Sequence, residues 1–271
     1  MKDKQTKNLE QQLLEAVKNN HTEKVKTLLS QGANVNLSDA SEVPLVMWAA
    51  LKCSLDLFQH LINEGADTNQ KGIIQLTETS HYGNLTGIAA AEGKFDLLQY
   101  LIETLEIDVD DPEIKHGTTP QWTALQWAIS KGETAIVQYL LAQGANPNPL
   151  YSHTTALHIC IQKQAINSFK YLLKAGAKTN LPGYRPLLSE ACRYPNHRFL
   201  EILVEQDVAL NAEKQAPIFF AVAYGDLDRV KWLIEKGANP VVQDAHGHSP
   251  LSLAKKLGLK KIEKYLKKLV R

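Results

Sequence analysis

The stretch from Thr123 to Asn148 repeats apolar residues with the period of a helix, and it does so twice. The first apolar stripe comprises Leu125, Trp127, Ala128 and Ile129. The second has the i, i+1, i+4, i+5 spacing of one helical face and comprises Ala135, Ile136, Tyr139, Leu140 and Leu141. Gly132 separates the stripes and Gly144 follows the second, and glycine readily adopts the positive φ that ends a helix. The pattern predicts a helix, a tight turn and a second, antiparallel helix.

The same pattern recurs along the chain at a regular interval. Variants of the ending that starts at Gly144 start at Gly32, Gly65, Gly176 and Gly237, with a degenerate copy at Asp207. Gly32 and Gly65 are 33 residues apart, and Gly144 and Gly176 are 32 apart. The opening of the unit recurs at Thr123-Ala124-Leu125, Thr155-Ala156-Leu157-His158, Arg185-Pro186-Leu187, Ala216-Pro217-Ile218 and Ser249-Pro250-Leu251. Since one helix pair cannot bury its own apolar face, the copies must stack on one another.

With this period and an opening related to T-P-L-H-x-A, the sequence resembles the ankyrin-repeat family. The resemblance covers nearly all of residues 9–271. It implies an all-α fold, an ankyrin-repeat solenoid of about eight helix-turn-helix units with short hairpin loops. In such a solenoid each repeat contacts only its neighbours, so the length of the chain does not set a number of globular domains.

We expect a frayed N-terminus over residues 1–8, which lack apolar periodicity, and a single array over 9–271. The expected repeats lie near 9–40, 41–70, 84–110, 119–149, 151–181, 184–212, 214–243 and 244–271. Insertions at 70–83 and 106–121 interrupt the array, and Ile73, Ile74 and Leu76 favour an extended finger in the first. Insertions in repeat arrays lie on one face, often the binding face, so we expect these two to form a shared projection.

The chain carries no sequence signal for a membrane span or for secretion. No apolar run approaches the roughly 18 residues that a membrane-spanning helix needs, and the polar start lacks the apolar segment of a secretory signal. We therefore expect a cytoplasmic protein. Cys53, Cys160 and Cys192 lie on or beside first helices of their repeats, and this odd number at wide spacing favours reduced, buried or half-buried thiols.

The net charge of +1 conceals a basic C-terminal end. Residues 251–271 carry eight basic side chains and one acidic side chain, Glu263. The lysines follow the helix period around Leu259, Ile262, Leu266 and Leu269, which fits the polar outer face of a terminal repeat. The alternative is a patch that binds an acidic partner or nucleic acid. We favour the polar outer face and expect no nucleic-acid partner.

The side chains that could carry chemistry form no known catalytic or metal motif. Cys160 follows His158 by two residues, which on a helix places their side chains on different faces. His246 and His248 form an H-x-H pair without two further zinc ligands nearby in the sequence. Phosphate-loop, dinucleotide, nucleophile-elbow and metalloprotease motifs are missing from the sequence. We expect no enzyme, no cofactor and no metal site; the alternative is an enzyme or modifier whose site is built on the two insertions.

The resemblance implies a concave binding surface made of hairpin tips and the exposed face of the first helices. On this chain it nominates the residues just before each repeat opening and just before each inter-helix turn. The candidates are Trp122, Lys131, Tyr151, Lys163, Tyr184, Arg185, Arg193, Tyr194, Tyr224, His246 and His248. Tyr, Trp and Arg dominate interface energetics. We expect four of them to line one continuous groove for a peptide or protein segment, namely Trp122, Tyr151, Tyr184 and Tyr194. The alternative is that the tyrosines pack between adjacent hairpins.

These observations predict a monomeric, non-enzymatic protein–protein interaction scaffold. Free-standing ankyrin arrays with irregular loops and a Lys-, Asn- and Gln-rich sequence also resemble secreted effectors of intracellular bacteria, which act on host proteins in the host cytosol. The partner cannot be read from the sequence, because the fold supplies a surface and not a chemical code.

Overall fold

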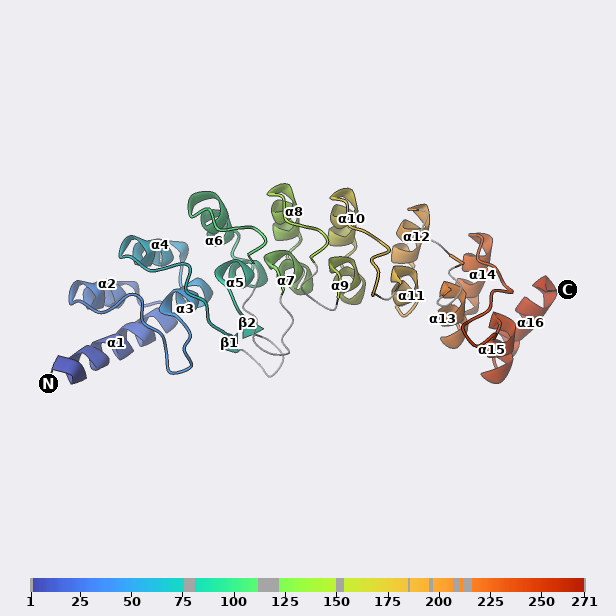
Figure 1. The fold of residues 1–271 in the computed structure, drawn as a ribbon, viewed down its shortest axis with the longest axis horizontal. Coiled ribbons are helices and arrows are strands. Elements are labelled where there is room, and N and C mark those ends of the chain that lie inside the picture. Colours follow the sequence, from blue (N-terminus) through green and yellow to red (C-terminus); the bar gives the residue numbers. More distant parts are fainter. Residues whose placement is uncertain are drawn as a thin grey trace. The chain divides into compact units, whose positions relative to one another are not determined.

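A computed structural model describes residues 2–75, 81–111, 122–149, 154–184, 186–194, 197–206, 210–211 and 216–270. The chain forms two compact units, Met1–His153 and Thr154–Arg271, which we call unit 1 and unit 2. Each unit is a series of antiparallel helix pairs (Figure 1).

The helix pairs of unit 1 are α1 (Lys2–Lys18) with α2 (Thr22–Ser30), α3 (Leu45–Lys52) with α4 (Leu55–Asn63), α5 (Leu85–Ala91) with α6 (Phe95–Gln99) and its π-helical continuation η1 (Tyr100–Thr104), and α7 (Ala124–Lys131) with α8 (Thr134–Ala142). The first helices lie side by side, and α5 packs against both α3 and α7. Figure 1 shows α4, α6 and α8 as a second row beside them.

The first helix of unit 1 includes residues 2–8, and the fraying expected of residues 1–8 stays a prediction. Helix α1 begins at Lys2. Lys, Gln and Glu are good helix formers, and Leu13 and Val17 of the same helix are fully buried. The buried part of α1 therefore holds the helix in place, and the polar first turns extend it.

The insertion between α4 and α5 forms a short β-hairpin. Strand β1 (Ile74–Gln75) pairs antiparallel with β2 (His81–Tyr82), with Ile74 opposite Tyr82. The side chain of Ile74 is fully buried. Of the residues expected to form an extended finger, Ile74 lies in this strand pair and Leu76 lies outside the described residues.

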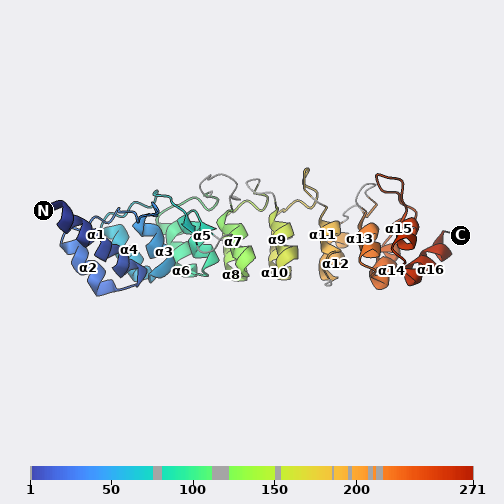
Figure 2. The same cartoon turned by 90° about the horizontal axis from the view of Figure 1, so that it is seen from below.

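The helix pairs of unit 2 are α9 (Ala156–Lys163) with α10 (Ile166–Lys174), α11 (Leu187–Ala191) with α12 (Arg198–Glu205), α13 (Pro217–Ala223) with α14 (Leu227–Glu235), and α15 (Pro250–Lys256) with α16 (Lys260–Leu269). Figure 2 shows the same pairs from a second direction. The described residues of both units confirm the all-α solenoid of helix-turn-helix pairs. None of their helices combines the length and the apolar character required to cross a membrane.

Small residues allow the first helices of unit 1 to approach one another closely. Ala50, Ala90 and Ala128 are fully buried on α3, α5 and α7. Larger side chains such as Phe58 and Leu61 of α4 cover this layer and are also buried. Each helix pair thus contributes one layer of a core that runs from pair to pair, as expected for a repeat protein.

The turn between α7 and α8 has the geometry predicted from its glycine. Gly132 has a φ of 85°, and the N–H of Glu133 donates to the carbonyl of Ala128 at 2.9 Å. This left-handed turn satisfies a carbonyl in the last turn of α7 from within the same repeat.

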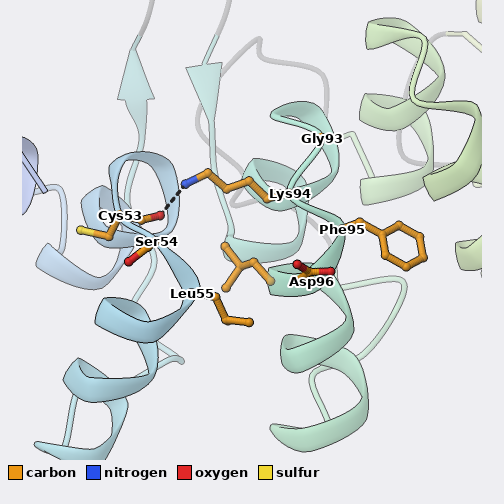
Figure 3. A pocket seen from close by; sticks show the side chains of 8 residues that line it. Cys53, Ser54, Leu55, Gly93, Lys94, Phe95 and Asp96 are labelled. Atoms are coloured by element: carbon orange, nitrogen blue, oxygen red, sulfur yellow. Dashed lines mark hydrogen bonds between the residues drawn. The ribbon is translucent and has the colours of Figure 1, made fainter.

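In the turn between α3 and α4, the carbonyls at the end of the helix are satisfied by a side chain. Cys53 stands where α7 is followed by Gly132, and it has an extended backbone with a φ of −90°. The ammonium of Lys94 donates to the carbonyls of Ala50 at 2.7 Å and of Cys53 at 3.0 Å (Figure 3). Lys94 belongs to the following helix pair, at the start of α6. A cation from the next repeat therefore caps the end of α3.

Unit 2 contains a related contact after α11, where Cys192 has a helical backbone and a cation of the next repeat again donates to two carbonyls. Cys192 follows α11, and the guanidinium of Arg229 donates from Nη1 to the carbonyl of Cys192 and from Nη2 to the carbonyl of Tyr194 at 2.8 Å. Arg229 lies on α14 in the next repeat, and its side chain is 3% exposed.

Candidate protein-binding surface

The last turns of the first helices expose a series of long side chains at equivalent positions. Lys131, Lys163, Arg193 and Tyr224 lie at or just beyond the ends of α7, α9, α11 and α13, and all four are exposed. The carbonyl end of a helix attracts cations, which by itself explains part of this series. Tyr224 has no such explanation, and 55% of its surface is exposed.

Arg193 and Tyr224 are brought together by neighbouring turns of unit 2. The guanidinium of Arg193 lies 3.4 Å from the carboxylate of Glu190, which is buried, and it lies beside the side chain of Tyr224. The nearby carboxylate of Glu190 and then Tyr224 raise the pKa of Arg193. The amide of Gln162 donates to the same Glu190 at 3.5 Å. The arginine is thus held in place while it remains accessible.

The aromatic candidates are more involved in packing than the sequence suggested. The ring of Trp122 lies 4.8 Å from that of Trp127 on α7, and Trp127 is buried as expected. Tyr184 lies 6.3 Å from the ring of His158. Tyr194 is half-buried, and its carbonyl accepts from Arg229. Of these contacts, the one between the rings of Tyr184 and His158 is of the kind that the alternative expected. The continuous aromatic groove stays a prediction, because Tyr151, like the candidate Arg185, lies outside the described residues.

His246 and His248 lie on the hairpin loop before α15, and both are exposed. The carboxylate of Asp244 accepts from their backbone N–H groups at 2.8 and 2.9 Å and lies 3.3 Å from Nδ1 of His248. The N–H of His248 is the main reason that the pKa of Asp244 is lowered. Asp244 therefore shapes this loop. Across the described part of the chain, no three His, Cys, Asp or Glu side chains are grouped so that they could hold a metal ion.

The three cysteines are free and buried, as predicted. Burial raises the pKa of Cys53 to about 11 and that of Cys192 to about 12, and it raises the pKa of Cys160 as well. Nucleophilic cysteines require the opposite shift. The Nδ1 atom of His158 is 2.6 Å from the hydroxyl of Thr155 at the start of α9, which is a structural contact.

The two insertions meet at a contact that the sequence did not reveal. The ammonium of Lys71 lies 2.6 Å from the carboxylate of Asp111, and the amide of Asn84 donates to the carbonyl of Asp111 at 2.6 Å. The expected shared projection therefore has a common base. Residues 112–121 lie outside the described residues. The two irregular repeat spacings were the only sign in the sequence that the insertions lie together. Charge alone did not distinguish Lys71 from other lysines.

A pocket of about 360 Å³ lies between the turn after α3 and the turn before α6. Figure 3 shows that Lys94 reaches across it toward Cys53, while Phe95 points away. Burial lowers the pKa of Lys94, but its ammonium is already engaged by two main-chain carbonyls. The pocket thus surrounds a structural contact between repeats.

Comparison with known proteins agrees with this architecture. A family model described as ankyrin repeats matches residues 2–72, 86–182 and 184–269. The palmitoyltransferase ZDHHC13 of Homo sapiens is 24% identical over 240 residues, which cover 86% of this chain and 31% of that protein. This chain thus spans less than a third of the length of that relative.

Two solved structures share the fold. The ankyrin repeat domain of Bcl-3, a member of the IkappaB protein family, is 23% identical with a TM-score of 0.59, and the match covers 68% of this chain and 84% of that chain. A chain from the complex of a predatory endopeptidase from Bdellovibrio bacteriovorus with an immunity protein is 23% identical with a TM-score of 0.57, covering 72% and 99%. With the family model matched along most of its length, the chain belongs to the ankyrin-repeat family.

Proposed function

We propose that the chain binds a partner protein through the surfaces that the last turns of the first helices form within unit 1 and within unit 2. Ankyrin repeats indicate a protein–protein interaction scaffold, and the fold is typically non-enzymatic. Repeat arrays present long surfaces in which each unit adds a few side chains. The binding of a specific partner by this chain, and a role as a bacterial effector in a host cytosol, go beyond these family properties.

The observation that carries the proposal is the exposed pair of Arg193 and Tyr224. A solvated surface turn has no need of an exposed tyrosine beside an exposed arginine, whereas these two residue types dominate binding energy in interfaces. Lys131 and Lys163 occupy equivalent places in the two repeats before α11 and are also exposed.

The test is capture of partners from lysates by the full chain and by the double variant Arg193→Glu, Tyr224→Ala. Lys170→Glu is the matched control, because it also reverses one exposed positive charge, on the second helix α10. We expect a protein captured by the original chain and by the control but lost from the double variant. Equal capture by all three, or loss only with the control, would show that the surface lies elsewhere.

A further inference from the structure

Tyr224 and Leu257 occupy the same place in adjoining repeats of unit 2. Each is the first residue after its helix, α13 or α15, and they are 55% and 47% exposed. Helix α13 packs against α15. The two turns also meet, because a Cβ added to Gly225 would lie 3.5 Å from Cδ2 of Leu259. Two exposed apolar side chains therefore lie on touching turns.

Cations lie on both sides of this apolar pair. Arg193 lies beside Tyr224, and Lys255 and Lys256 form the exposed last turn of α15 immediately before Leu257. We call these five residues the turn surface, and it comprises Arg193, Tyr224, Lys255, Lys256 and Leu257.

Helix α16 adds a strong positive charge beside the turn surface. Its exposed lysines fall on one helical face, away from the buried Ile262 and Leu266, and they are Lys260, Lys261, Lys264, Lys267 and Lys268. The one acid of α15 and α16, Glu263, lies 2.6 Å from Lys267 and 3.8 Å from Lys260. The hydrogen bond from Lys267 is the largest cause of its lowered pKa, and Lys255 contributes too, which places α15 and α16 lysines in one cluster.

The acids near the turn surface are already engaged. Glu190 is buried against Arg193, and Asp226 lies 3.4 Å from Arg229 and caps α14. By sequence, unit 2 carries 19 Lys and Arg against 10 Asp and Glu. The field at this surface is therefore positive, and it attracts anionic partners.

We propose that the turn surface binds an acidic protein segment that carries apolar side chains between its carboxylates. Aspartate and glutamate on the segment would pair with Arg193, Lys255 and Lys256, and an apolar side chain would cover Tyr224 and Leu257. The inference rests on the proposed function, since it names the class of partner for the unit 2 part of the same surface. Charge complementarity of this kind sets specificity and association rate, while the apolar centre supplies affinity.

The apolar centre favours a protein segment over other polyanions. A phosphate backbone gains from lysines and a base can stack on Tyr224, but nucleic acid leaves the aliphatic side chain of Leu257 without an apolar partner. A membrane-surface helix buries its apolar face in lipid, whereas Ile262 and Leu266 of α16 are buried inside the protein.

The experiment selects peptides from a random phage-displayed library on the full chain, followed by fluorescence anisotropy with synthetic, labelled versions of the enriched peptides. We expect enrichment of Asp and Glu together with Leu, Ile or Phe. Lys255→Glu with Lys256→Glu, and separately Tyr224→Ala with Leu257→Ser, should each weaken binding about tenfold. Lys170→Glu with Lys174→Glu makes the same charge change on α10 and should have little effect beyond a small loss at low salt.

Four results would overturn the inference. The first is enrichment of neutral or basic peptides, and the second is a loss of binding with the α10 control as large as that with the turn-surface variants. The third is tighter binding of a thymidine oligonucleotide or of phosphatidylserine vesicles than of the peptides, with no dependence on Tyr224 and Leu257. The fourth is a selection that enriches no peptide, while partner capture from lysates still decides the proposed function independently.

Discussion

The turns that follow α7 and α3 have the same length but are stabilised from different places. After α7, Gly132 adopts a left-handed conformation, and the backbone of the same repeat satisfies the end of the helix. After α3, Cys53 stays extended, and Lys94 of the following repeat supplies the hydrogen bonds. The first turn is self-contained, whereas the second depends on its neighbour. The difference shifts stability from within a repeat to the interface between repeats.

The turn after α11 shows that this dependence is not an accident of one repeat. Cys192 again follows the helix, and Arg229 of the next repeat again donates to two carbonyls. Arg229 is nearly fully buried, while Lys94 is only part-buried. We therefore expect the two cation-capped turns to be most sensitive to loss of the cation, and the glycine turn to depend on its own backbone.

The largest effect is expected for Arg229→Met, which leaves two carbonyls at the end of α11 without their donors. Buried groups that lose a partner cost about 1–3 kcal/mol each, so we expect a loss of about 3 kcal/mol in the free energy of unfolding. Urea denaturation followed by circular dichroism measures it. Hydrogen exchange should show the loss of protection concentrated in α11 and α12, on the other side of the repeat interface from the substitution.

Lys231→Met is the matched control for Arg229→Met, because Lys231 lies two residues away on α14 with its side chain 42% exposed. Its effect should stay within about 0.5 kcal/mol, as for other surface positions. If Arg229→Met changed exchange only in α14, the cap on α11 would not be what stabilises that turn.

Lys94→Met should have a smaller effect of the same kind. The side chain is part-buried, and water can reach some of the carbonyl groups that Lys94 leaves, so we expect a loss of about 1.5 kcal/mol. The measurement is again the free energy of unfolding, with exchange followed in α3 and α4. Lys52→Met at the exposed end of α3 tests whether any cation nearby matters, and we expect it to change little.

The contrast between the turns also explains what the sequence could predict about the fold. Gly132 and Gly144 mark the ends of α7 and α8 in the local sequence, so the positive φ of both glycines and the helix pair could be predicted. The cap of α3 by Lys94 could not be predicted. Lys94 lies 41 residues after Cys53, and nothing in the local sequence distinguishes it from a surface lysine. The pattern within a single repeat therefore does not predict hydrogen bonds between neighbouring repeats.

The candidate surface likewise has a part that the sequence predicted and a part that it did not. The position of Arg193 and Tyr224 follows from the repeat register, and the structure places both on the surface. The register did not predict that Trp122 would pack on Trp127. Leu257 aligns with Tyr224 in the next repeat but was not predicted, because an aliphatic side chain at this position is not typical of an interface.

Gly132→Ala tests the self-contained turn. Nothing lies within 4 Å of an added Cβ, so the cost comes only from the left-handed backbone with its φ of 85°. We expect a loss of about 1 kcal/mol in the free energy of unfolding. Gln164 has a φ of 58° at the corresponding turn after α9, so Gln164→Gly should raise the free energy of unfolding. Loss of the hydrogen bond that the Gln164 side chain donates to the carbonyl of Ile161 offsets part of this gain. A loss of several kcal/mol for Gly132→Ala would mean that the turn has contacts beyond its backbone.

The smallest and most specific effect is the coupling between Cys53 and Lys94. Cys53→Gly should lower stability by itself, because the buried thiol and its contact with the carbonyl of Val17 are lost. It should also permit the left-handed turn seen at Gly132, which satisfies the helix end without Lys94. We therefore expect Lys94→Met to cost about 0.5–1 kcal/mol less in the Cys53→Gly background than in the original chain. Cys53→Ala is the control, since it removes the thiol without favouring the left-handed turn and should leave the cost of Lys94→Met unchanged. Equal costs in all three backgrounds would show that the cation and the glycine do not substitute for each other, and the two kinds of turn would then share only their length.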